Sequence, residues 1–124
     1  MNNMEAILDG SFMLHGIRNG IDFLSQLEEQ GFKIKIPREV LQELKDAKLK
    51  LKPNDRLSLN ILFELLEKRK IKKLGLGQGR IDLQLIKLGR EGAYIATMDN
   101  AIRRSVKNSI IISNNSKQIV VERK

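Results

Sequence analysis

Four acidic residues that lie far apart in the sequence have the chemistry to bind metal ions together. They are Asp9, Glu43, Asp82 and Asp99. Asp9 closes the apolar run at residues 6–8, and Asp99 follows a second apolar run at residues 93–96. Both acids are therefore expected where buried strands end, and in an open parallel sheet that edge is where ligands bind. Oxygen ligands gathered there suit hard cations such as Mg²⁺ or Mn²⁺.

The rest of the chain is basic, which sets these acids apart. The 124 residues carry a formal net charge of +8, with a calculated pI of 9.9. Such a charge favours a polyanionic partner such as nucleic acid. A local cluster of carboxylates would repel a phosphate backbone unless metal ions lay between them. This combination is typical of a metal-dependent nuclease, in which two ions about 3.5–4 Å apart activate water and stabilise the leaving oxygen.

Alternating strands and helices are expected to position the four acids. Predicted strands cover residues 5–9, 33–36, 71–74, 93–96, 110–112 and 119–121. Predicted helical segments begin at Ser11, at Pro37, after a cap at Asn54 or Asp55, at Ile81 and after Asp99. This order predicts one domain, residues 1–124, with a three-layer α/β/α sandwich around a mostly parallel sheet. If the first strand and the strand at 93–96 are neighbours where the strand order reverses, Asp9 and Asp99 face each other.

Composition excludes several other classes of site. The chain has no cysteine, so a disulfide framework, a thiolate metal site and a cysteine nucleophile are all absent. The sequence shows neither a leader segment nor an apolar run near the roughly 20 residues of a membrane helix. We therefore expect a cytoplasmic protein without membrane contact.

Short motifs in the same order resemble those of PIN-domain ribonucleases. They lie at residues 7–11, at 36–44, at Asp82 and at 96–104, so the similarity spans nearly the whole chain. Within that family the chain is most similar to the archaeal branch related to small-subunit rRNA-processing nucleases, and the toxin branch of toxin–antitoxin pairs is the close competitor. The resemblance implies a PIN-like fold, Mg²⁺- or Mn²⁺-dependent cleavage of RNA, and the four acids as catalytic metal ligands. Ser11 and Thr97 would orient carboxylates or water.

The sequence departs from the family pattern at two positions. Gly10 follows Asp9 where the family usually has threonine, which is expected to loosen the turn at Asp9. Asn100 and Ala101 follow Asp99 where some members supply another acid, which is expected to weaken one metal site.

Each acid also has a structural explanation. Asp9 and Asp99 are placed to cap the helices that follow them, and Asp82 suits the positive end of a helix dipole. Glu43 lies in a helix where acids are usually solvated or paired with lysine. The glycine-rich loop at 75–80 lacks a full phosphate-binding motif and is interpreted as a mobile edge of the site. His15, the only histidine, is assigned no role.

Five basic residues are candidates for contacts with RNA phosphates: Arg103, Arg104, Lys107, Lys45 and Lys48. The alternative is a solvated charged face. Aromatic residues are scarce, so base stacking and sequence-specific RNA reading are not expected.

Three functions remain open at this point. The first is a metal-dependent endoribonuclease in rRNA processing. The second is the ribonuclease toxin of a toxin–antitoxin pair, held inactive by an antitoxin, and the third is a non-catalytic RNA-binding factor of ribosome assembly. The family often forms homodimers through helices, and the apolar positions around Leu62 and Leu66 suit either a core or such an interface.

Overall fold

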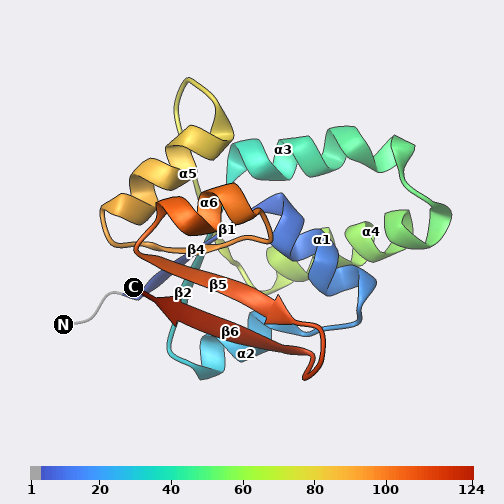
Figure 1. Cartoon of the computed structure of the whole chain (residues 1–124). Helices are drawn as coiled ribbons and strands as arrows, with labels where there is room; N and C mark the ends of the chain where they lie inside the picture. The colour runs from blue at the N-terminus through green and yellow to red at the C-terminus, as the bar shows by residue number, and fades with distance from the viewer. Residues whose placement is uncertain (1–3) are drawn as a thin grey trace.

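A computed structural model describes residues 4–124 of the chain and shows alternating strands and helices (Figure 1). The strands are β1 (Glu5–Leu8), β2 (Lys33–Pro37), β3 (Lys72–Leu74), β4 (Tyr94–Ala96), β5 (Asn108–Ser113) and β6 (Gln118–Arg123). The helices are α1 (Gly10–Arg18), α2 (Phe23–Glu29), α3 (Arg38–Ala47), α4 (Pro53–Lys68), α5 (Ile81–Arg90) and α6 (Asn100–Ser105), with a short 3₁₀ helix at Lys48–Lys50.

The six strands form one mostly parallel sheet in the order β3-β2-β1-β4-β5-β6. β1 pairs in parallel with β2 on one side and with β4 on the other. The chain therefore builds the sheet outward in both directions from β1, and the strand order reverses between β1 and β4. Only β6 is antiparallel, because it returns from β5 through a tight turn. The predicted α/β class, the mostly parallel sheet and the adjacency of β1 and β4 are confirmed.

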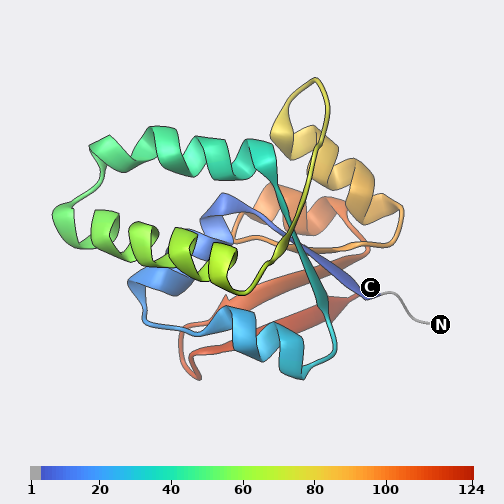
Figure 2. The same cartoon turned by 180° about the vertical axis from the view of Figure 1, so that it is seen from behind.

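Side chains of successive β1 residues enter two separate apolar clusters, as the alternation of a strand requires. Ala6 and Leu8 belong to the larger cluster, which also contains residues of α1, α2, α3 and α4. Ile7 belongs to the smaller cluster with residues of α5 and α6. Figures 1 and 2 show these helices lying against the sheet from its two sides. Both faces of the strands that carry the candidate site are thus buried.

A close approach at Gly89 sets the position of α5. A Cβ atom at Gly89 would lie only 2.3 Å from Cγ1 of Val106 and 2.9 Å from Cγ1 of Ile95 in β4. Only glycine permits this contact without a shift of the helix or the strand. The first turn of the same helix carries Asp82, so this contact helps to fix where that acid lies.

Two helix starts differ from the sequence-based prediction. α1 begins at Gly10 rather than Ser11, because the Asp9 carboxylate accepts a hydrogen bond from the Gly10 amide. α4 begins at Pro53 rather than after a cap at Asn54 or Asp55. Proline suits the first position of a helix because its fixed φ is helical and its missing N–H needs no partner there.

The apolar residues of α4 divide into a buried and an exposed set. Leu62 and Leu66 are core residues, each 3% exposed. Leu57, Ile61 and Leu65, at intervals of four residues, are exposed. Of these two sets, the structure assigns only the first to the core. Within residues 4–124, none of the helices combines the length and the apolar character needed to span a bilayer.

Candidate active site

The structure brings the four predicted acids to one pocket at the point where the strand order reverses. Asp9 follows β1, Glu43 lies on α3, Asp82 lies in the first turn of α5, and Asp99 immediately precedes α6. All four line a pocket of about 480 Å³, which is completed by Gly79, Arg80, Ile81 and Ile102. Asp9, Glu43 and Asp99 also line a neighbouring pocket of about 550 Å³ that includes Asp46 and Lys50. Three of the four acids therefore lie between two adjoining hollows.

Asp9 is fixed by hydrogen bonds to both of its carboxylate oxygens. Oδ1 accepts from the Gly10 amide at 2.8 Å, which caps α1. Oδ2 accepts from the Thr97 hydroxyl at 2.8 Å and from the Ser11 hydroxyl at 3.1 Å. The turn at Gly10 is therefore closed by the carboxylate itself, in contrast to the loosening expected from the missing threonine.

Thr97 connects Asp9 to Asp99. Its side chain is fully buried, and its hydroxyl accepts from the Asp99 amide at 3.1 Å while it donates to Asp9. The Ser11 hydroxyl accepts from the Met98 amide at 3.1 Å, which ties the same two segments together a second time. The carboxyl ends of β1 and β4 are thus held in a fixed relation by two hydroxyl groups.

Asp99 caps α6 with one oxygen. Its Oδ1 accepts from the amides of Ala101 at 2.8 Å and Ile102 at 3.3 Å, so the cap does not use Oδ2. Both Asp9 and Asp99 are therefore helix caps, as the structural explanation of each predicts. Asp9 and Asp99 therefore both cap helices and line the pocket.

The negative charges of neighbouring acids act on the carboxyl group of Glu43. The buried residues Val40 and Leu44 anchor α3 to the core, and Glu43 projects from the exposed side of the helix toward the pocket. Partial burial of its carboxyl, followed by the negative charges of Asp9, Asp46 and Asp82, raises the pKa of Glu43 above its usual range.

Asp82 is paired with an arginine that sequence reasoning missed. Arg80 donates from Nε to Oδ1 of Asp82 at 3.2 Å and from a terminal nitrogen to Oδ2 at 2.8 Å. The Arg-x-Asp spacing at the start of a predicted helix was the available signal. Arg80 is the one basic residue among those that line the four-acid pocket.

The donor set of the pocket matches a hard cation in chemistry. It offers carboxylate oxygens, with hydroxyl groups behind them and a single guanidinium as counter-charge. Across residues 4–124, no three acidic or histidine side chains already converge on one ion-sized position. Mg²⁺ is commonly held by only one or two carboxylates, with water and substrate phosphate completing its shell. The residues present therefore fit such an ion without a closed protein cage.

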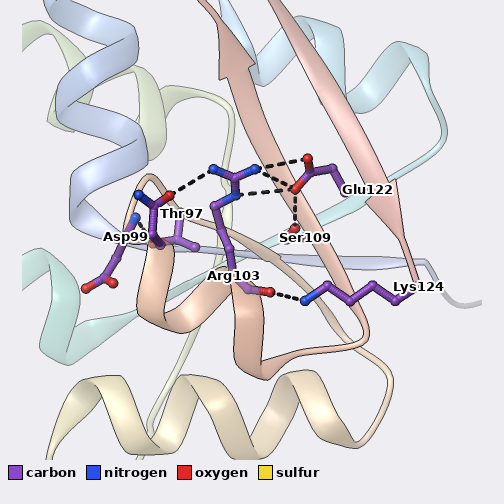
Figure 3. Close-up of polar contacts among 7 residues, drawn as sticks. Thr97, Asp99, Arg103, Ser109, Glu122 and Lys124 are labelled. Carbon is purple, nitrogen blue, oxygen red and sulfur yellow. Dashed lines mark hydrogen bonds and ion pairs between the residues drawn. The ribbon is translucent and has the colours of Figure 1, made fainter.

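Arg103, a predicted RNA contact, belongs to a separate network that we call the Arg103–Glu122 corner (Figure 3). One terminal nitrogen of Arg103 donates to both oxygens of Glu122, at 2.9 and 3.0 Å, and the other donates to Asn100 at 3.0 Å. The buried Ser109 hydroxyl also donates to Glu122, at 3.1 Å. Figure 3 shows the Asp99 carboxylate pointing away from this corner. The side-chain oxygen of Asn100 thus accepts a hydrogen bond from Arg103. Some members of the family that the sequence resembles have an acid at this position.

The other predicted basic residues lie in different places. Arg104 and Lys107 are exposed, and Arg104 lines a pocket of about 480 Å³ beside the corner, together with Arg123 and Lys124. Lys45 instead lies over the ring of Phe63, and Lys48 donates to Asn60 at 2.9 Å, so both contact α4. Neither of these two lysines lines the pockets that contain the acids.

Comparison with known proteins finds similarity to solved structures. No family model matches the sequence, and no curated protein matches it. Among solved structures, the chain is similar to a domain of a functionally unknown protein from Methanocaldococcus jannaschii DSM 2661. The two share 18% sequence identity with a TM-score of 0.55, over 89% of this chain and 91% of the other. At that identity the likeness shows that the two chains share a fold and nothing about activity.

Proposed function

We propose that this chain is a metal-dependent endoribonuclease with a PIN-like three-layer α/β/α sandwich. The observation that carries the proposal is the meeting of Asp9, Glu43, Asp82 and Asp99 in one pocket, brought there by four different elements. Four carboxylates on a chain of net charge +8 are costly to bring together unless a cation compensates them. RNA as the substrate is supported by the motif resemblance and by that positive charge.

Each residue has a role in this proposal. Asp9 and Asp99 would hold Mg²⁺ or Mn²⁺, with Thr97 and Ser11 orienting the Asp9 carboxylate and Thr97 also holding the backbone amide of Asp99. Glu43 and Asp82 complete the negative wall of the pocket. When bound, divalent ions supply the activation of water and the stabilisation of the leaving oxygen. The reaction adds water across a phosphodiester P–O bond and needs no protein nucleophile.

The RNA backbone would reach the pocket past exposed cations near α6. Arg104 and Lys107 are exposed there, and Arg123 and Lys124 line the hollow beside Arg104. Arg103 keeps a structural role because Glu122 and Asn100 occupy its donors. We assign phosphate binding to the exposed residues Arg104 and Lys107, since contacts that position the RNA backbone need accessible donors.

One observation favours a second candidate, a non-catalytic RNA-binding factor of ribosome assembly. Arg80 already compensates Asp82, and the acids do not converge on a single ion within residues 4–124. In that alternative the basic surface binds RNA and the acids are structural caps. Salt-sensitive RNA binding without metal-stimulated cleavage would support it.

The nuclease proposal is compatible with two cellular roles, and growth experiments distinguish them. The motif order favours small-subunit rRNA processing, while a toxin would use the same chemistry on another RNA. Growth arrest on expression, relieved by an antitoxin expressed with the chain, would identify the toxin. Normal growth together with accumulation of precursor rRNA in a deletion strain would identify the processing enzyme.

The test is cleavage of labelled single-stranded and structured RNAs with Mn²⁺, Mg²⁺ or EDTA. We compare the wild type with Asp9→Asn and Asp99→Asn, using Arg90→Gln as a surface control at the far end of α5. Loss of a ligand is expected to lower the rate by at least about 100-fold, the upper range for residues that only support a ligand. Asparagine also caps helices well, so both variants should stay folded by circular dichroism.

Two results would contradict the proposal. Wild-type protein that binds RNA but never cuts it under any metal condition would replace the nuclease with the assembly factor. Cleavage that survives in both folded variants would place the activity outside the four-acid pocket.

A further inference from the structure

Arg80 occupies the position of a cation inside the four-acid pocket. Its guanidinium contacts both oxygens of Asp82, and among residues 4–124 it is the only basic side chain that lines the pocket. The structure thus places one positive charge among the acids of this pocket.

The Arg80–Asp82 pair is easily broken. The two side chains are 75% and 39% exposed, and their residues are two positions apart. Exposed ion pairs of this kind contribute little net free energy, because water screens the charges and both side chains lose freedom. A divalent cation that binds the Asp82 carboxylate therefore has to displace only a weakly held Arg80 guanidinium.

The backbone around Arg80 is anchored, so its side chain can move alone. On one side of the loop the Leu76 amide donates to both oxygens of Glu39, each at 3.1 Å. On the other side the Gln84 amide group donates to the carbonyl of Gln78 at 2.7 Å. These hydrogen bonds tie the loop to both α3 and α5. A change of partner at Arg80 then needs only new side-chain torsions.

We propose that Arg80 is an exchangeable counterion of the acid pocket. In the metal-free protein its guanidinium neutralises Asp82. A divalent ion that binds the acids displaces it, and the released guanidinium then binds a phosphate oxygen of the RNA strand. The proposal rests on the proposed function for the identity of both ligands, and it adds a coupling between them: metal binding unmasks a phosphate-binding group.

The exchange predicts opposite effects of one substitution on the two ligands. Arg80→Gln removes the competitor for Asp82, so Mn²⁺ affinity should rise by about two- to fivefold, the range an exposed ion pair allows. The same change removes a charge-assisted contact to phosphate, so RNA affinity in saturating Mn²⁺ should fall by about tenfold. Without metal Arg80 is partly occupied by Asp82, so RNA affinity in EDTA should fall by less, about two- to fivefold.

The experiment measures binding rather than turnover. Mn²⁺ affinity is obtained by calorimetry on the full chain, and RNA affinity by anisotropy of a labelled single strand in Mn²⁺ or EDTA, with intact strand verified on a gel after each titration. Arg90→Gln removes the same charge at the opposite end of α5 and should change neither affinity selectively. In an Asp82→Asn background, Arg80 has lost its partner, so Arg80→Gln should weaken RNA binding in EDTA as strongly as it does in Mn²⁺.

The outcomes separate this proposal from the nuclease itself. Unchanged or weaker Mn²⁺ binding by Arg80→Gln would overturn the counterion, and an equal loss of RNA affinity with and without Mn²⁺ would overturn the exchange. Wild-type protein that shows no saturable Mn²⁺ binding would overturn both proposals together. The predicted opposite effects in a protein that never cuts RNA would support the exchange while rejecting the nuclease.

Discussion

Two arginine–carboxylate pairs, one in the four-acid pocket and one outside it, differ in the exposure of the arginine and in their neighbours. Arg80–Asp82 joins residues two apart, borders the four-acid pocket and has an arginine side chain that is 75% exposed. Arg103–Glu122 joins α6 to β6, and its arginine is 28% exposed. Figure 3 shows the second pair set among further polar partners.

The difference lies in how many other groups depend on each pair. Glu122 also accepts from the buried Ser109 hydroxyl, and Arg103 also donates to Asn100. Breaking that pair would leave a buried hydroxyl and several donors without partners, which is what makes such networks structural. For Asp82, besides Arg80, the structure shows only a bond to the Leu83 amide. The Arg103–Glu122 pair therefore links α6 to β6, whereas the Arg80–Asp82 pair is the one that we propose to be exchangeable.

Among residues that are not themselves proposed metal ligands, the largest effect is expected at Thr97, which ties Asp9 to Asp99. Thr97→Val keeps the shape but removes the donor to Asp9 and the acceptor for the Asp99 amide. Mn²⁺ affinity should fall by about 10- to 100-fold, the usual cost of losing a residue that orients a ligand. Thr97→Ser keeps the hydroxyl and should restore most of it. Calorimetry on both variants tests this, and full Mn²⁺ affinity in a folded Thr97→Val protein would show that Thr97 is only a core residue.

A smaller effect, on stability alone, is expected at the Arg103–Glu122 corner. The hydrogen bond from Arg103, followed by that from Ser109 and the nearby positive charges, lowers the pKa of Glu122. Because the folded pKa is depressed, the stabilisation is present above the unfolded pKa and is lost as the pH falls through the folded one. Glu122→Gln should thus lower the free energy of unfolding at neutral pH by up to about 1 kcal/mol, discounted for the partial exposure of both side chains.

The check on Glu122 is urea unfolding of both proteins at neutral pH and again in acid. The two curves should approach each other as the pH falls from the usual glutamate value of 4.5 through the lower folded pKa, because Glu122 is protonated in both states only below the folded pKa. Mn²⁺ affinity should be unchanged. If the variant kept its stability but lost Mn²⁺ binding, the Arg103–Glu122 corner would belong to the metal-binding site.

The smallest effect is expected at Glu43 and has the opposite sign. Its pKa is raised by partial burial and by the charges of Asp9, Asp46 and Asp82, so its ionisation destabilises the fold as the pH rises from the unfolded pKa through the folded one. Glu43→Gln should stabilise the metal-free protein at neutral pH, by less than about 0.5 kcal/mol because the residue is exposed. Thermal unfolding in EDTA measures this, and a less stable variant would contradict the repulsion.

Sequence patterns predicted the strands and the meeting of the acids because both follow from local rules. The apolar run before Asp9 forms β1, and the run before Asp99 contains β4. That the two strands are neighbours was a condition of the prediction, and the strand order of the sheet meets it. A polar residue after each strand then lies at one edge of the sheet. For Asp9 and Asp99, the strand end was enough.

The pairing of long side chains could not be predicted in the same way. Lys45 and Lys48 contact α4 because the chain turns back at the 3₁₀ helix Lys48–Lys50, which packs against α4, and Asn100 contacts Arg103 because β6 places Glu122 beside it. These partners depend on tertiary geometry that residue periodicity does not contain. The division of the α4 face, with Leu62 buried and Ile61 exposed, has the same origin.

The most direct test of the account compares Mn²⁺ binding by Asp99→Asn and Glu122→Gln with that of the wild type. The two positions lie on either side of α6, one in the pocket and one in the corner (Figure 3). The account predicts saturable binding to the wild type, a loss of at least about 100-fold in Asp99→Asn, and wild-type affinity in Glu122→Gln. Equal affinities in the two variants, or no saturable binding to the wild type, would contradict it.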